Sequence, residues 1–260
     1  DYDIADVVPY INWAYFYHAW QVRQPVGQQR LRHEAEQWLS AQQGRYRCHA
    51  VFRLLDARSE DDDIIVSNAG TAVRIPCLRQ QQQDSDFLCL ADFIAPGGGD
   101  KLGLFVASAD QGLGTDFDAD PYQKMMAQLL ADRLAEAATE RLHEQVRKQL
   151  WGYAPGEQLS IGEMHQERFQ GIRPAVGYPS LPDASLNFIL DAILDFSLIG
   201  VTLTENGAMC PHASVSGLMM AHPQARYFTV GTIGADQLHD YARRRGLPEH
   251  TVRKFLSANL

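Results

Sequence analysis

The 260-residue chain has few of the features that mark membrane or secreted proteins. It has no apolar run of the length that crosses a bilayer, and its first residues, D-Y-D-I, lack the basic and then apolar layout of a secretory signal. We therefore expect a cytoplasmic protein without a membrane partner. Only four cysteines occur and none forms a C-x-x-C pair, which is too sparse for a disulfide framework and predicts reduced thiols. The first residue is not methionine and an expected helix starts at once, so we expect a fragment of a longer polypeptide.

Positive charge is also in short supply. The chain has 23 Lys and Arg against 32 Asp and Glu, for a formal net charge of −9. This balance disfavours nucleic acid as a partner, because neutralising phosphates needs clustered Lys and Arg.

Common catalytic signatures are missing. The sequence has no G-x-G-x-x-G after a strand, no G-x-x-x-x-G-K-[ST] and no G-x-S-x-G, so nothing indicates a Rossmann site, an NTPase or a serine hydrolase. Residues 143–147 match the zinc motif H-E-x-x-H at the first two positions but carry arginine at the second ligand position, so we interpret them as a surface helix turn. The spacing of Cys210, His212 and His222 matches no common zinc pattern, and we predict no metal site.

The most unusual segment that is present is residues 171–183, G-I-R-P-A-V-G-Y-P-S-L-P-D. Its three prolines fix φ and withhold amide donors, its two glycines permit positive φ, and Arg173 and Tyr178 stand on this stiffened frame. Rigid irregular backbone suits a small charged ligand, because its amides and carbonyls are in place before the ligand binds. A purely structural loop would have the same composition, and both interpretations stay open from this segment alone.

Hydrophobic periodicity predicts an α+β domain with an antiparallel sheet, since two runs of strands are separated by one long helix. Hydrophobic residues make up 45% of the chain, as in an ordinary globular protein, and we expect a single domain over residues 1–260. Expected helices cover residues 1–20 with a break near Pro9, 28–42, 121–151, 160–169, 184–196, 235–246 and 249–256. Expected strands cover residues 46–55, 64–68, 71–76, 87–95, 102–107, 201–204, 213–221 and 227–233.

The long helix carries a row of acidic residues, Asp132, Glu136 and Glu140, at i, i+4 and i+8. Such a row favours a solvated helix face, and we expect it to face water. Asp132 is a candidate contact for a partner domain because it shares this row with Glu136, but the pattern favours a solvated side chain.

Charged and aromatic residues near Arg173 fit a zwitterionic ligand such as an amino acid. Glu167 precedes Arg173 by six residues, close enough to share a site. Carboxylates can take an ammonium group while a guanidinium takes a carboxylate bidentately. Tyr178 and Tyr227 would add aromatic faces for a cation, although buried core tyrosines look the same in sequence.

Several segments together closely resemble the C-terminal activation domain of cobalamin-dependent methionine synthase. They are residues 10–13 (Y-I-N-W), 90–93 (L-A-D-F), 130–137 (L-A-D-R-L-A-E-A), 142–144 (L-H-E), 146–148 (V-R-K), 151–155 (W-G-Y-A-P), 171–175 (G-I-R-P-A), 177–179 (G-Y-P), 213–217 (A-S-V-S-G) and 222–223 (H-P). The segments occur in the family's order over nearly the whole chain. The R-x-x-x-G-Y core, preceded by W-G-Y-A-P, is highly specific.

The resemblance implies a C-shaped α+β domain with a bent antiparallel sheet flanked by helices, one of them long and central. It implies a methyltransferase module of methionine biosynthesis that binds S-adenosylmethionine and supports reductive methylation of cob(II)alamin to methylcobalamin. The module would have no methionine synthase turnover alone. Cobalamin would belong to a separate module, because this chain lacks the family's cobalamin-ligand motif D-x-H-x-x-G.

The implied partners are that cobalamin-binding domain and a flavodoxin-type or flavoprotein reductant. Because flavodoxins are acidic, a local basic patch at residues 243–245 is one candidate docking site, although these arginines could equally complement a helix dipole.

The resemblance also carries over site residues, none of which is a catalytic nucleophile. The S-adenosylmethionine-binding positions are Arg173, Ala175, Gly177, Tyr178 and Tyr227, with Glu136 and Glu167 as nearby carboxylates. Backbone from Arg173 to Gly177 would contact adenine and ribose. Asn12 stands where the family has aspartate, so it can accept a hydrogen bond but supplies no charge, and Phe228 stands where relatives carry a second tyrosine.

Two alternative functions compete with the one that this resemblance implies, and the first follows from the departure at Asn12. A corrinoid-protein docking or sensing module with a decayed S-adenosylmethionine site would account for Asn12. An ordinary small-molecule methyltransferase is disfavoured, because the glycine-rich turn after a first strand is missing.

Overall fold

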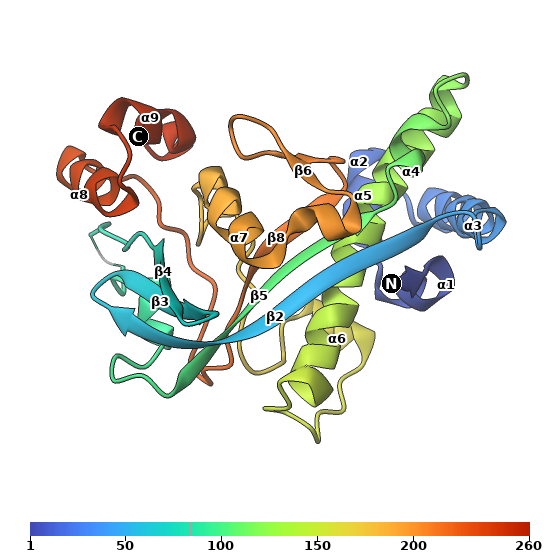
Figure 1. The fold of residues 1–260 in the computed structure, drawn as a ribbon. Helices are drawn as coiled ribbons and strands as arrows, with labels where there is room; N and C mark the ends of the chain where they lie inside the picture. Colours follow the sequence, from blue (N-terminus) through green and yellow to red (C-terminus); the bar gives the residue numbers. More distant parts are fainter. Residues whose placement is uncertain (84) are drawn as a thin grey trace.

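The computed structural model describes residues 1–83 and 85–260, and within them six strands form one antiparallel sheet. The strand order is β4-β3-β2-β5-β8, with β1 also paired to β2. These strands are β1 (Tyr2–Asp3), β2 (Arg47–Glu60), β3 (Asp63–Asn68), β4 (Thr71–Pro76), β5 (Asp100–Ala109) and β8 (Ser214–Met219). β2 and β5 pair from Cys48↔Ala109 to Ala57↔Asp100 and bend along their length (Figure 1). They form the long axis of the sheet.

Helices cover both faces and both ends of this sheet (Figure 1). The α-helices are α1 (Ile4–Val7), α2 (Trp13–Ala19), α3 (Pro25–Ala41), α4 (Gly112–Thr115), α5 (Pro121–Gln145), α6 (Ile161–His165), α7 (Asn187–Leu194), α8 (Ala235–Arg245) and α9 (Glu249–Phe255). Single turns and a small ribbon complete the described chain: η1 (Val8–Tyr10), η2 (Leu90–Phe93), the π turn η3 (Val146–Leu150), η4 (Ala184–Leu186), η5 (Phe196–Ile199), β6 (Thr202–Leu203), β7 (Met209–Cys210) and η6 (Ser257–Asn259). Every helix in the described residues is too short or too polar to span a membrane.

Successive residues of β5 serve two different cores, because side chains of a strand alternate between its faces. Phe105 packs in the core that contains Leu134 of α5. Leu104 and Val106 pack on the opposite face in the core that contains Leu190 of α7. A strand buried on both faces explains why β5 reads as a nearly continuous apolar run rather than an alternating one.

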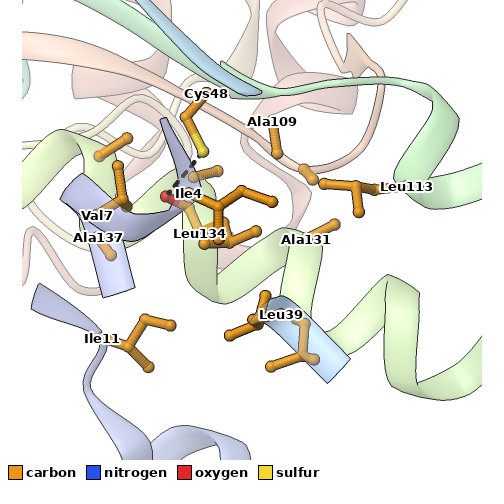
Figure 2. Packing of buried hydrophobic residues seen from close by; sticks show 14 of the residues in the cluster. Ile4, Val7, Ile11, Leu39, Cys48, Ala109, Leu113, Ala131, Leu134 and Ala137 are labelled. Carbon is orange, nitrogen blue, oxygen red and sulfur yellow. Dashed lines mark hydrogen bonds between the residues drawn. The ribbon is translucent and has the colours of Figure 1, made fainter. Parts of the chain in front are cut away.

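The N-terminal segment fixes α5 against the sheet. Ile4, Val7 and Ile11 are almost fully buried and pack in one core with Leu134 and Leu39 (Figure 2). Each such side chain contributes roughly 1.5–3 kcal/mol when it leaves water. The same view shows the Sγ of Cys48 on β2 donating to the carbonyl of Leu134, 3.9 Å away. The long helix therefore lies in a fixed position across the sheet.

The predicted long helix is present as α5 and η3. Asp120 caps its start by accepting from the amides of Tyr122 at 2.8 Å and Gln123 at 3.2 Å, and Gly152 ends it with a φ of 77°. The β2–β3 hairpin, β4, β5, β8 and the two C-terminal helices also lie where periodicity predicted them. The α+β fold class is confirmed.

Three predicted elements are wrong. Residues 87–95 form the turn η2 instead of a strand, because the Asp92 carboxylate accepts from the Cys89 amide at 2.8 Å and closes a capped turn. Residues 227–233 pair with no strand in the part of the chain that the structure describes, although Val230 is fully buried, so their apolar pattern reflects burial of an irregular segment. The expected first helix is divided among β1, α1, η1 and α2, with Pro9 inside η1.

Candidate functional site

The proline-rich segment 171–183 lies against β8 as an irregular extension of the sheet. Isolated bridges join Ile172 to Met220 and Ala175 to Gly217. Gly217 is required for this approach, because a Cβ there would collide with the carbonyl of Pro174. The segment therefore has a fixed backbone, as its prolines predicted, and hydrogen bonds to β8 add to that rigidity.

A cavity of about 580 Å³ lies between this segment, α5 and the start of the chain. Predicted residues that line it are Asn12, Glu136, Glu167, Arg173, Ala175, Tyr178, Tyr227 and Phe228. Gly177 is not among the lining residues, but its φ of 88° turns the backbone between Ala175 and Tyr178, which are. Several further lining residues were not among the predicted site residues: Tyr10, Tyr15, Arg133, Glu140 and His165.

Arg173 is held at the cavity by Glu140 of α5. Its Nη2 is 2.5 Å and its Nη1 3.1 Å from the two carboxylate oxygens of Glu140. Burial alone would lower the pKa of Arg173, but the charge and hydrogen bonds of Glu140 raise it, so the guanidinium stays charged. The prediction that the acidic row of α5 faces water is wrong for Glu140, which is only 4% exposed.

His143 extends this contact into the interior. It is fully buried, with Nδ1 3.3 Å from Nη1 of Arg173 and Nε2 3.4 Å from the hydroxyl of Tyr153. The ring of Phe169 packs edge-on against it, with centroids 4.8 Å apart. Burial lowers the pKa of His143 well below its ordinary value, and the charges of Arg173 and Arg147 lower it further.

Arg147 is also buried, so the prediction that residues 143–147 form a surface helix turn is wrong. Its Nη2 lies 2.7 Å and its Nε 2.8 Å from oxygens of Glu157, and its guanidinium stacks 4.3 Å from the Phe169 ring. The loop after α5 thus supplies the counter-charge that sequence periodicity could not show.

A second polar pair forms the outer wall of the cavity. The hydroxyl of Tyr178 donates to Glu136 at 2.8 Å, which links the proline-rich segment to α5. Burial, followed by the charge of Glu136, raises the pKa of Tyr178. The Tyr178 side chain remains half exposed at the cavity mouth.

Most of the chain matches one known family. Residues 3–246 match the family model described as the activation domain of vitamin B12-dependent methionine synthase. The chain belongs to this activation-domain family. A solved structure described as the MetH reactivation domain bound to AdoHcy has a TM-score of 0.93 and 38% identity to it, covering 99% of this chain and 88% of that one.

In this activation domain the remaining predicted residues have structural roles as well. Tyr227 accepts a hydrogen bond from the Arg173 amide at 3.0 Å, and so fixes the backbone beside the guanidinium. Burial raises the pKa of Tyr227. The Phe228 amide donates to Ser180 Oγ at 3.1 Å. Asn12 caps α2, its Oδ1 accepting from the Ala14 amide at 3.2 Å.

Glu167 has a backbone φ of 57°, which places an acidic side chain of the turn after α6 at the cavity. Burial raises the pKa of Glu167, while Arg173 lowers it and Glu140 raises it. The carboxylates of Glu140 and Glu167 therefore both lie near this guanidinium, and of these two Glu140 is the one that pairs with it.

The residues considered for metal binding are not gathered in one place. His212 is almost fully exposed and contacts Asp132 at 3.3 Å, whereas the ring of His222 lies against Phe93. Across residues 1–83 and 85–260 of the activation domain, His, Cys, Asp and Glu form no group of three or more that could hold a metal ion.

Proposed function

We propose that this activation domain binds S-adenosylmethionine in the cavity beneath residues 171–183 and supports the reductive methylation that returns cob(II)alamin to methylcobalamin. One observation carries the proposal: Arg173 and the carboxylates of Glu136 and Glu167 line the same cavity. The AdoHcy bound to the similar reactivation domain supports it. We infer that residues 1–260 act as one domain, since a single sheet supports the cores on both of its faces.

The lining residues fit the chemistry of the ligand. The methionyl end is a zwitterion, and Arg173 can take its carboxylate while Glu136 or Glu167 takes its ammonium. The volume of about 580 Å³ is in the range of small-molecule sites. Ala175 and Gly177 leave the loop backbone uncovered by bulky side chains, so its polar groups can contact the nucleoside.

The proposed role of this chain is to bind and orient. S-adenosylmethionine, when bound, supplies a methyl group activated by its sulfonium. Holding that methyl in line with an acceptor on another module needs positioning rather than a protein nucleophile. The pairing of Tyr178 with Glu136 and of Tyr227 with the Arg173 amide supports this role, because both fix the cavity wall before a ligand enters.

Calorimetric titration of the 260-residue chain with S-adenosylmethionine tests the proposal. We expect Arg173→Ala to weaken binding by well over tenfold, since a charged hydrogen bond contributes about 1.5–3 kcal/mol. Arg168→Ala is the matched control, because Arg168 is exposed and its one ion pair within residues 1–83 and 85–260 is with Glu163, at 3.7 Å. Unchanged affinity in Arg173→Ala would remove the carboxylate assignment.

The second candidate is a docking or sensing module with a decayed ligand site. Its one supporting observation is Asn12, whose side-chain oxygen is engaged in capping α2. An absence of heat and of thermal stabilisation at millimolar S-adenosylmethionine would favour this candidate.

The partners remain proposals: a cobalamin-binding domain and a flavodoxin-type reductant. The predicted basic patch at residues 243–245 is wrong as a docking site. Arg244 and Arg245 are 10% and 6% exposed, and they pair with Asp63 and Asp183 inside the protein.

A further inference from the structure

The hydrogen-bond donors of Arg173 are used unevenly. A guanidinium has five N–H groups: one on Nε and two on each Nη. Glu140 accepts from Nη1 and Nη2, which occupies the terminal edge of the group. The ring Nδ1 of His143 lies 3.3 Å from Nη1, at its remaining hydrogen.

The position of His143 fixes its tautomer. Arg173 can only donate, so Nδ1 must be the unprotonated acceptor, and the proton of a neutral ring is then on Nε2. Nε2 lies 3.4 Å from the Tyr153 hydroxyl, which can accept it. The result is a chain of contacts from the loop after α5, through α5, to Arg173.

Two donors of Arg173 remain, on Nε and on Nη2. No acceptor within residues 1–83 and 85–260 takes a hydrogen bond from Nε or a second one from Nη2. These two N–H groups lie on the same edge of the planar group, in the parallel arrangement that binds both oxygens of one carboxylate. Arg173 lines the cavity, where the carboxylate of a bound ligand could accept from both groups.

We propose that Glu140 and His143 are positioning residues that reserve the Nε–Nη2 edge of Arg173 for the ligand carboxylate, and so select ligands that retain it. The inference rests on the proposed function and deepens it. Without Glu140 the guanidinium would be free to rotate its terminal edge toward the cavity. Without His143, which is itself fully buried, Nη1 would lose one of its two acceptors and the group would shift to find another.

The test compares S-adenosylmethionine with its decarboxylated form, which keeps the sulfonium, nucleoside and amine but lacks the carboxylate. Dissociation constants for both ligands are measured by calorimetry on the 260-residue chain and on Glu140→Gln, His143→Leu and His143→Gln. We expect the first two variants to lose about tenfold in affinity for S-adenosylmethionine and less than about twofold for the decarboxylated form. His143→Gln should recover part of the loss, because its amide oxygen can accept from Nη1.

The outcomes separate this inference from the proposed function. A folded variant that weakens both ligands equally would show a merely structural role and overturn the inference, while the proposed function would stand. Failure of the unsubstituted chain to bind either ligand would sink both. Melting curves identify variants that do not fold, and if His143→Leu is one of them, Glu140→Gln and His143→Gln decide the question.

Discussion

Two regions of the molecule bury arginines against carboxylates, and they differ in what remains unpaired. Near α8, Arg244 uses all three of its nitrogens within the protein: Nε binds Asp240, Nη1 binds Asp63 and Nη2 binds the Cys77 carbonyl. At the cavity, Arg173 leaves Nε without a protein acceptor among the described residues. Burial of a charge therefore does not by itself indicate a binding site, whereas unused donors on an arginine that lines a cavity support the one proposed above.

The first prediction concerns the fully paired region and has the largest expected effect. Asp63→Ala removes the buried partner shared by Arg244 and Arg74, and Asp63 itself is only 1% exposed. Leaving a buried arginine without its partner should lower the free energy of unfolding by about 3–5 kcal/mol. Urea unfolding measures this loss. Affinity for S-adenosylmethionine in the folded fraction should be unchanged, and a large loss of affinity would contradict the division between the two regions.

The second prediction concerns stability at the cavity. Glu140→Gln keeps one acceptor oxygen but removes the charge opposite Arg173, whose side chain is 18% exposed to the cavity. Because water can reach this guanidinium, we expect a smaller loss of about 1–3 kcal/mol in urea unfolding. A loss as large as that of Asp63→Ala would indicate that Arg173 is as structural as Arg244.

The sequence predicted elements well where local pattern decides them. The β2–β3 hairpin around its acidic turn, β4 and the gap-free period of α5 are all local signals. Residues 227–233 misled because burial on an irregular path gives the same apolar pattern as a strand. Whether such a segment pairs with another strand depends on contacts distant in sequence, which no local pattern contains.

At the cavity, motif resemblance selected Arg173, Tyr178 and Glu136, which do line it. Periodicity wrongly placed Glu140 and His143 at the surface, whereas both are buried. Acidic spacing along α5 suggested a solvated face, whereas the segment 171–183 and the loop after α5 fold over that face. A usable signal existed: small and apolar residues occur on nearly every side of α5, which is typical of a helix covered all round. The identity of the covering segment depends on tertiary contacts far apart in sequence.

The smallest predicted effect concerns pH and again contrasts the two regions, since α8 has no buried histidine comparable to His143. The groups facing His143 are Arg173, Arg147, Tyr153 and, through Arg173, Glu140. Burial first, and then the two arginines, lower its pKa in the folded chain, so the folded state favours the neutral ring. An unfolded chain binds this proton near pH 6.5, which means that the stabilising contribution is complete above that pH. It is lost as the pH falls from about 6.5 toward the lowered pKa, with a slope of at most about 1.4 kcal/mol per pH unit.

Urea unfolding of the chain and of His143→Gln between pH 7 and pH 5 measures this loss of stability, and the variant should give the shallower slope. Since Glu167 and all other titrating groups are common to both proteins, identical slopes would mean that the buried ring accepts a proton in the folded state, and its assignment as an acceptor for Arg173 would then be wrong.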